Sequence, residues 1–293
     1  MNRHFANDIH GDVSRRDKMS KAAIMLVTII ILQKEESIMG RIIAIANQKG
    51  GVGKTTTSIN LAACLAEKGF HTLAVDMDPQ GHLTTGFGVN KDDLKHTIYD
   101  VICENCNIGE ALLLNVFPDL NLLPSNRYLA GAEVELIGEP DMQYILKKQL
   151  NKVKDKYDYI IIDCPPALGM LTINSMTAAN TVIVPIQCEF FALDGLSQLI
   201  YTIELIQQKL NKDLKIEGVV FTMFDSRTNL SLQVVENVKD NLNQNVYKTI
   251  IPRNVRLAEA PSHGMPIITY DNRSTGAESY RLLADEVITN TSV

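Results

Sequence analysis

The sequence predicts an α/β fold, with a mainly parallel, doubly wound sheet flanked by helices. Three observations support this prediction. Apolar runs rich in β-branched residues recur at 42–46, 159–162 and 181–186, as buried parallel strands require. Two of the runs predicted as strands end in an aspartate, and helical patterns separate the runs. A glycine-rich stretch joins the first run to the first helical pattern, which gives the order strand, loop, helix.

The glycine-rich stretch reads Lys49-Gly50-Gly51-Val52-Gly53-Lys54-Thr55-Thr56. Glycines let several backbone N–H groups point at one anion, and the helix that follows adds its positive dipole end. Lys54 is expected to reach the β- and γ-phosphates of ATP, and the Thr55 hydroxyl to hold Mg²⁺. The residues expected to bind the nucleotide in this P-loop are Gly50, Gly51, Val52, Gly53, Lys54, Thr55 and Thr56.

Two later strands are predicted to end in carboxylates. The run at 71–75 leads into Asp76-Met77-Asp78-Pro79-Gln80-Gly81, and the run at 159–162 leads into Asp163-Cys164-Pro165-Pro166. Because ligands of doubly wound sheets bind at the carboxyl ends of strands, these acids are expected beside the P-loop. Asp78 is expected to orient the attacking water or take its proton, whereas Asp76 and Asp163 are expected to support Mg²⁺. A polar strand end before a Pro-Gly turn is the alternative for the first segment.

The P-loop departs from the usual pattern G-x-x-x-x-G-K-[ST], because Gln48 stands at the first glycine position and Lys49 is added. This arrangement resembles the deviant Walker A motif of the ParA/MinD family of dimeric ATPases. Segments 76–81 and 163–166 resemble the switch I and switch II motifs of that family. The resemblance implies that Lys49 crosses to the nucleotide of a partner subunit and acts in catalysis with Lys54 and Asp78.

The resemblance continues in the second half of the chain. The run 187–195 leads into a helix predicted from about Leu193 to Leu210. We expect this run to be a dimer contact, with helix capping by Asp194 as the alternative.

Two later runs resemble the chromosome-partitioning branch of the family, Soj/ParA. They are 225–229, after a predicted strand at 216–224, and 252–264, after a predicted strand at 246–251. In that branch Arg227 and Arg256 match residues that bind DNA without sequence preference, which is physically reasonable because arginines neutralise phosphates. A surface or ion-pair role is the alternative for each arginine alone. By the same analogy, Pro252 and Asn254 are expected near the adenine.

Composition limits the function classes. The chain has 293 residues and a net charge of −6, so DNA contact would have to come from a local patch. Its five cysteines are scattered and odd in number, which indicates a reduced, cytosolic protein rather than a disulfide framework. Cys103 and Cys106 form a C-x-x-C pair without a second pair at metal spacing. We therefore expect them to serve packing rather than metal binding.

Residues 1–38 precede the first predicted strand. They hold a basic patch and then an apolar run at 22–32, which is shorter than the roughly 20 residues of a membrane-spanning helix. The codons AAG-GAG-GAA would encode Lys34-Glu35-Glu36 and contain a purine-rich ribosome-binding sequence shortly before Met39. The hypothesis is that translation starts at Met39, so that 1–38 are a leader and 39–293 one ATPase domain. Otherwise 1–38 form a mobile N-terminal arm.

These features together imply a Mg²⁺-dependent ATPase that partitions chromosomes or plasmids. By resemblance, ATP drives face-to-face homodimerisation, and the dimer binds DNA non-specifically. Hydrolysis, stimulated by a ParB/Spo0J-type centromere-binding partner, releases the DNA. The expected location is cytoplasmic and nucleoid-associated, without membrane contact, because the C-terminal helix from Gly276 has mixed charge rather than a basic amphipathic face.

Three alternatives remain open from the sequence. A MinD-like membrane-cycling cell-division regulator shares the P-loop but needs an amphipathic C-terminal helix. An iron–sulfur ATPase of the nitrogenase iron-protein type needs ligand cysteines at a dimer axis. A dethiobiotin-synthetase-like ligase needs a substrate pocket, for which the sequence carries no sign.

Overall fold

One mixed sheet forms the centre of the fold in a computed structural model that describes residues 40–189, 192–242 and 244–290. Its eight strands have the order β3-β4-β2-β5-β1-β6-β7-β8. Neighbouring strands are parallel except for β3 and β4, which are antiparallel. The strands are β1 Arg41–Ile45, β2 Thr72–Asp76, β3 Leu113–Phe117, β4 Leu120–Leu123, β5 Tyr159–Asp163, β6 Thr181–Gln187, β7 Lys215–Phe224 and β8 Val246–Pro252.

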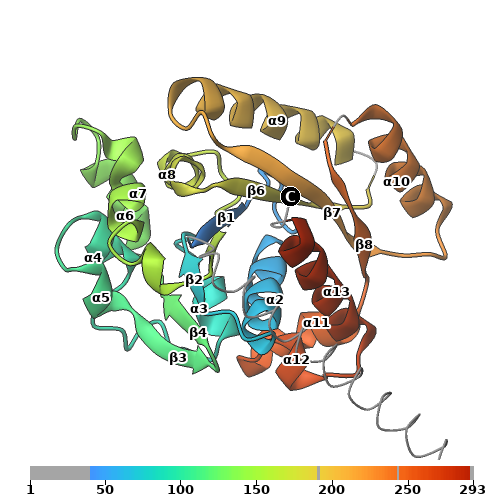
Figure 1. Ribbon diagram of the computed structural model, residues 1–293, viewed down its shortest axis with the longest axis horizontal. Helices are drawn as coiled ribbons and strands as arrows, with labels where there is room; N and C mark the ends of the chain where they lie inside the picture. The colour runs from blue at the N-terminus through green and yellow to red at the C-terminus, as the bar shows by residue number, and fades with distance from the viewer. Residues whose placement is uncertain (1–39, 190–191, 243, 291–293) are drawn as a thin grey trace, which may run out of the picture. The chain divides into compact units, whose positions relative to one another are not determined.

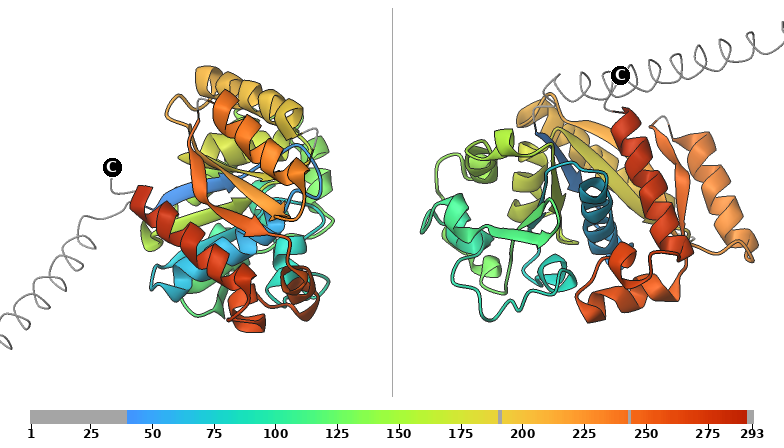
Figure 2. Two further views of the ribbon diagram at one scale, coloured as in Figure 1. Left: turned by 90° about the vertical axis from the view of Figure 1, so that its right-hand side faces the viewer. Right: turned by 60° about the horizontal axis from the view of Figure 1, so that its bottom comes forward.

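Helices cover both faces of the sheet (Figure 1). On one face α2 (Lys54–Glu67) and α13 (Thr275–Asn290) lie side by side, together with α3 (His82–Gly86), α11 (Val255–Glu259) and α12 (Ile267–Tyr270), as the two views of Figure 2 also show. The other face carries α4 (Ile98–Ile102), α5 (Ile108–Ala111), α6 (Leu129–Glu135), α7 (Ile145–Leu150), α8 (Met170–Ala178), α9 (Ala192–Lys209) and α10 (Asn229–Asn241). Short 3₁₀ helices are η1 (Met142–Tyr144), η2 (Lys154–Lys156) and η3 (Ala260–His263).

The central strands are buried on both faces. In β1, Ile42 and Ala44 belong to the core under α4–α10, whereas Ile43 and Ile45 belong to the core under α2 and α13. Successive side chains of a strand point to opposite faces, so a strand covered on both sides must be apolar throughout. This explains the continuous apolar runs of the sequence. The predicted α/β fold with a mainly parallel, doubly wound sheet is confirmed.

The register of the central strands brings the acidic strand ends together. Asp76 of β2 lies opposite Asp163 of β5, and Asp163 lies opposite Ile45, the last residue of β1. The P-loop leaves β1 at this same edge and continues into α2. Parallel pairing therefore places the P-loop and both aspartates at one end of the sheet.

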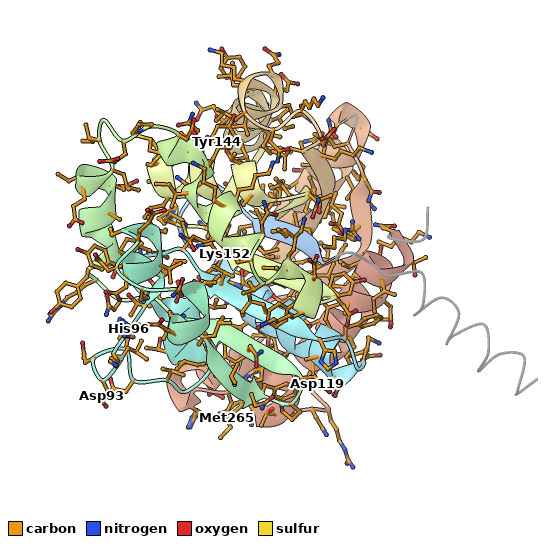
Figure 3. The ribbon with its side chains drawn as sticks, turned by 60° about the vertical axis from the view of Figure 1, so that its left-hand side comes forward. Asp93, His96, Asp119, Tyr144, Lys152 and Met265 are labelled. Carbon is orange, nitrogen blue, oxygen red and sulfur yellow. The ribbon has the colours of Figure 1, made fainter. Side chains whose placement is uncertain are left out.

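One predicted helix was wrong in its extent. The pattern of apolar and lysine residues in 141–156 predicts a single amphipathic helix with an exposed lysine-rich face, but the segment divides into η1, α7 and η2. The backbone leaves the helical range between the pieces, with φ −110° at Tyr144 before α7 and φ −129° at Val153 before η2. Tertiary contacts hold the pieces: Tyr144 Oη donates to the Leu210 carbonyl at 3.3 Å, and Asn174 Nδ2 donates to the Met142 carbonyl at 2.9 Å. Figure 3 labels Tyr144 and Lys152 near the two ends of the segment.

The antiparallel edge strand β3 was missed. Its residues are only partly buried, and its pairing with β4 is irregular between Leu113 and Phe117. Asn115 within it has φ 53°. A short, bulged edge strand lacks the apolar period on which strand prediction relies.

Some predictions fall outside the described residues. They concern residues 1–38 and the start at Met39, and, in the run 187–195, Phe190, Phe191 and the side chain of Asp194. The predicted long helix of that region is α9.

We predict that Ile161→Ala destabilises the protein strongly. Ile161 is 0% exposed in β5, which pairs with both β1 and β2, and emptying such a position costs about 2–5 kcal/mol. Urea unfolding followed by circular dichroism measures the loss. The matched control is Leu114→Ala on β3, where the side chain is 68% exposed and the change should stay within about 0.5 kcal/mol. Equal effects of the two variants would contradict the prediction.

Candidate active site

The P-loop between β1 and α2 needs glycine at two positions. Gly51 has φ 75° and Gly53 has φ 87°, a left-handed backbone that strains other residues. Gly53 is the N-cap of α2, and its helix end has neither a side-chain cap nor an acidic residue in the first turn. The first N–H groups of α2 therefore point into the loop, where they are available to an anion.

Lys54 lies inside the loop rather than at its surface. Its side chain is attached to the first turn of α2, and Nζ donates to the Lys49 carbonyl at 3.1 Å. Lys54 is only 7% exposed. Burial lowers the pKa of Lys54, while the nearby carboxylates of Asp163 and Asp78 act in the opposite direction. A phosphate in the loop could take the place of the carbonyl and would add favourable charge.

The carboxylate of Asp163 joins β5 to α2. Thr55 Oγ1 donates to Asp163 Oδ2 at 2.7 Å, and Ser58 Oγ donates to Oδ1 at 2.8 Å. Asp163 is completely buried, and burial together with the neighbouring Asp76 raises its pKa to about 8. Such a group favours a cation nearby, because a positive charge stabilises the ionised carboxylate.

Asp76 is fixed by α3. The backbone N–H and the hydroxyl of Thr84 donate to Asp76 Oδ2 at 2.8 and 2.7 Å. Burial raises the pKa of Asp76 to about 6, and the Thr84 hydrogen bonds act against this rise. Asp78 follows two residues later, is 8% exposed, and its Oδ1 accepts from the Gln80 N–H at 2.9 Å. This bond holds the carboxylate of Asp78 in one orientation at the strand end.

Two of the three predicted catalytic residues, Lys54 and Asp78, line one cavity, whereas Lys49 does not line it. The cavity has a volume of about 420 Å³ and its walls include Gly50, Gly51, Gly53, Lys54, Thr55, Thr56 and Asp78. A second pocket of about 260 Å³ shares Gly53, Thr56 and Met223 with it and is lined further by Pro252, Asn254 and Tyr280. The nucleotide residues predicted at both ends of the chain thus meet in adjoining cavities. Asn254 also caps α11, because its Oδ1 accepts from the Leu257 N–H at 3.2 Å.

The residues at this edge suit Mg²⁺. The described residues hold no group of three or more His, Cys, Asp or Glu arranged around a common metal position. The oxygen donors present are the Thr55 hydroxyl and the carboxylates of Asp163 and Asp76. Mg²⁺ prefers oxygen ligands, keeps several waters and is often completed by substrate phosphates. A site with few protein ligands therefore fits this ion.

Lys49 forms an ion pair within its own chain. Its Nζ lies 2.7 Å from Glu189 Oε2, just beyond the end of β6. Both side chains are partly exposed, 37% for Lys49 and 46% for Glu189. The predicted role of Lys49 toward a partner subunit stays a prediction.

The two arginines predicted to bind DNA also carry carboxylate partners. Arg227 binds Asp225 through Nε and Nη2 at 2.8 and 2.7 Å, and this bond lowers the pKa of Asp225 to about 2. Arg256 pairs with Glu259 at 3.0 Å and lies 3.6 Å from Asp271. The turn with Arg227 and the start of α11, which carries Arg256, are neighbours, because Phe224 at the end of β7 is in register with Pro252 at the end of β8. Both arginines thus extend from the edge of the sheet that carries the P-loop.

The cysteine pair considered for the iron–sulfur alternative lies in the described part of the chain. Cys103 and Cys106 are free thiols at the end of α4, and burial, more than the nearby carboxylates, raises their pKa, to about 12 for Cys103. Within the described residues, every helix is too short or too polar to cross a membrane.

Sequence reasoning missed three residues of this site. Ser58 had a usable signal, since it lies three positions after Thr55 on a helix and so shares its face. Thr84 and Thr222 had none: Thr84 bonds to Asp76 from α3, and Thr222 donates to the Val52 carbonyl at 2.8 Å from β7. Glu189 lies in the run expected to be a dimer contact, but its pairing with Lys49 had no signal in the sequence.

The chain is similar to known proteins over most of its length. A family profile described as an AAA domain matches residues 40–216. The sporulation initiation inhibitor protein Soj of Bacillus subtilis is 55% identical over 252 residues, which cover 86% of this chain and 100% of Soj. The chromosome partitioning protein ParA of Myxococcus xanthus is 51% identical over 250 residues, covering 85% of this chain and 88% of that protein. A solved cobyrinic acid a,c-diamide synthase from Mycobacterium smegmatis, with a bound ATP analogue and magnesium, is 40% identical with a TM-score of 0.77, covering 86% of this chain and 96% of that one.

We predict that Thr55→Ala and Ser58→Ala both weaken Mg²⁺ binding, so that ATP hydrolysis needs more Mg²⁺, and that Thr55→Ala has the stronger effect. Loss of the Ser58 bond to Asp163 should raise the Mg²⁺ concentration at half-maximal activity about 10-fold or more, as changes next to metal ligands do. The measurement is a Mg²⁺ titration of the hydrolysis rate.

Ser279→Ala is a closely matched control. Like Ser58, Ser279 donates to the carbonyl four residues earlier in its helix, but it lies partly exposed on α13, where it does not contact Asp163. If Ser58→Ala and Ser279→Ala gave the same Mg²⁺ titration, the assigned role of the Ser58–Asp163 bond would be wrong.

Proposed function

The chain belongs to the Soj/ParA family of chromosome-partitioning ATPases, and from this membership we propose that ATP controls its binding to DNA. The observation that carries the proposal is the network of the P-loop, Thr55 and Asp163 at the carboxyl edge of the sheet. Like its relatives, the protein is a Mg²⁺-dependent ATPase.

In the proposed complex the phosphates of ATP bind the loop amides and Lys54. Bound Mg²⁺ would neutralise phosphate charge, with Thr55 as a ligand and Asp163 and Asp76 acting through water. Asp78 orients the attacking water, since its carboxylate lines the same cavity as Lys54. The base enters the adjoining pocket lined by Pro252 and Asn254.

Two ATP-bound subunits then close face to face as a homodimer. Each Lys49 contributes its ammonium to the phosphates bound by the other subunit, and this charge would be worth most in a site closed to water. Closure would also gather the arginines of both subunits, two copies of Arg227 and of Arg256, on one surface.

Strand β7 supports a link between the nucleotide and the DNA. Thr222 on β7 is bonded to the P-loop carbonyl of Val52 at 2.8 Å, and the same strand ends at Phe224, directly before the loop with Arg227. The Arg253 N–H donates to the Phe224 carbonyl at 2.9 Å, which connects this strand end to the segment before α11, the helix that carries Arg256. A change at the P-loop therefore has a short, hydrogen-bonded route to both arginines.

The remaining parts of the proposal follow from the family alone. A ParB/Spo0J-type centromere-binding protein would stimulate hydrolysis and so release the DNA. The protein would act in the cytoplasm on the nucleoid. The MinD-like alternative is not favoured, because relatives that are 51% and 48% identical carry partitioning functions in their names.

The deciding experiment is retardation of an arbitrary DNA duplex by Asp78→Ala protein, with ATP, with ADP and with neither. This variant should still bind ATP but hydrolyse it slowly, so that the ATP complex accumulates. We expect retardation only with ATP, and weaker at higher salt because arginines displace counterions. If the protein forms a dimer with ATP on a sizing column but binds no DNA, the partitioning proposal is refuted. The MinD-like and ligase-like alternatives would then have to be considered again.

We predict opposite effects of two substitutions in the segments that carry Arg227 and Arg256. Arg256→Glu should abolish retardation, because it reverses a charge that faces phosphate. Asp225→Asn should strengthen DNA binding several-fold at low salt, because it removes the carboxylate that occupies the Arg227 guanidinium. Titration of a labelled duplex in the Asp78→Ala background measures both.

Glu236→Gln on α10 is the control for Asp225→Asn, since it changes the net charge equally at an exposed site. Asp225→Asn would contradict the assignment if it bound DNA no better than this control.

A further inference from the structure

The segment Gln48-Lys49, at which the P-loop departs from the common pattern, is bound to the segment that follows β6. Lys49 Nζ contacts Glu189 Oε2 at 2.7 Å. Gln48 Nε2 donates to Gln198 Oε1 at 2.6 Å and to the Gly195 carbonyl at 3.3 Å, both on α9. A glycine at position 48 could make neither side-chain contact. The two unusual residues of the loop thus have one common target, the start of α9 and the residues before it.

The residue before this segment, Asn47, is also held by hydrogen bonds. Asn47 Nδ2 donates to the Pro185 carbonyl of β6 at 2.8 Å, and Asn47 Oδ1 accepts from the Lys49 N–H at 3.0 Å. These bonds set where the Lys49 backbone lies relative to β6, so the ammonium reaches Glu189 from a defined origin. The ion pair is therefore a specific contact rather than a meeting of two unrestrained side chains.

We propose that Glu189 is a positioning residue for Lys49, and that their ion pair sets how readily two copies of this chain assemble on ATP. The inference rests on the proposed function, in which Lys49 binds the nucleotide of the partner subunit. An ammonium held by Glu189 in its own chain must leave that carboxylate before it reaches a phosphate across the interface. Assembly is then an exchange of one anionic partner for another at each of the two sites.

The strength of the pair suits such an exchange. Pairs at this degree of exposure are weak, and Glu189, 46% exposed, can be hydrated once Lys49 has left. A phosphate group offers Lys49 more negative charge than one carboxylate does. The pair therefore opposes assembly without preventing it, and its loss should lower the dimer dissociation constant by about 3- to 10-fold.

The experiment measures the dimer dissociation constant with Mg-ATP by sedimentation velocity, in full-length protein carrying Asp78→Ala to slow hydrolysis. Glu189→Gln keeps the size of the side chain and removes its charge. Glu204→Gln, at an exposed position further along α9, changes the net charge equally and is the matched control. Lys49→Gln and the double variant Lys49→Gln/Glu189→Gln complete a cycle that isolates the interaction between the two side chains.

We expect Glu189→Gln to have a lower dimer dissociation constant than the parent protein, and Glu204→Gln to have the same dissociation constant as the parent. Once Lys49 is replaced by Gln, Glu189→Gln should no longer lower the dissociation constant. The inference is overturned if Glu189→Gln leaves the dissociation constant unchanged, or if it gives the same gain without Lys49, since the effect would then be general charge repulsion. Failure of the proposed function has a different signature, because the parent protein would stay monomeric with ATP at every concentration.

Discussion

The buried carboxylate of Asp163 connects the parts of the site. It accepts the hydroxyls of Thr55 and Ser58 from the first turns of α2, and so fixes the helix that carries the P-loop against the centre of the sheet. Burying a carboxylate is costly unless it is hydrogen-bonded or paired with a cation. The raised pKa of Asp163, about 8, expresses that cost, and a Mg²⁺ ion beside Thr55 would reduce it. Binding of metal and nucleotide should therefore also strengthen the packing of α2 on β5.

The order of strands in the sheet explains how the nucleotide site could influence the segments that carry Arg227 and Arg256. β1 lies between β5 and β6, and β7 follows β6, so the loop after β1 faces strand ends on both sides. On one side it meets the aspartates of β2 and β5. On the other it meets Thr222 of β7, which bonds to the Val52 carbonyl. The chemistry of hydrolysis and the segments that carry the arginines thus border the same few residues, without an intervening domain.

A common arrangement recurs at the cations proposed to meet phosphates of a partner or of DNA. Lys49 is paired with Glu189, Arg227 with Asp225, and Arg256 with Glu259. All three pairs are partly exposed, so each costs little to open. In a chain with a net charge of −6, such pairs would keep phosphate binding weak until several cations act together. Weak individual contacts that add up on dimerisation are well suited to a switch, because release then requires only that the dimer part.

The fold class, the P-loop and the two acidic strand ends could be predicted because each is encoded by neighbouring residues. Apolar runs indicate buried strands, and glycines beside Lys54 indicate a phosphate loop before a helix. The contacts that hold these parts had no such local signal. Thr55 and Asp163 are 108 positions apart, and Lys49 and Glu189 are 140 positions apart. Thr84 looks like an ordinary polar residue in the sequence, and the first piece of 141–156 is held by contacts with α8 and with Leu210, just after α9. Which strand ends become neighbours follows from the order of strands in the folded sheet, and no single segment of the chain carries that order.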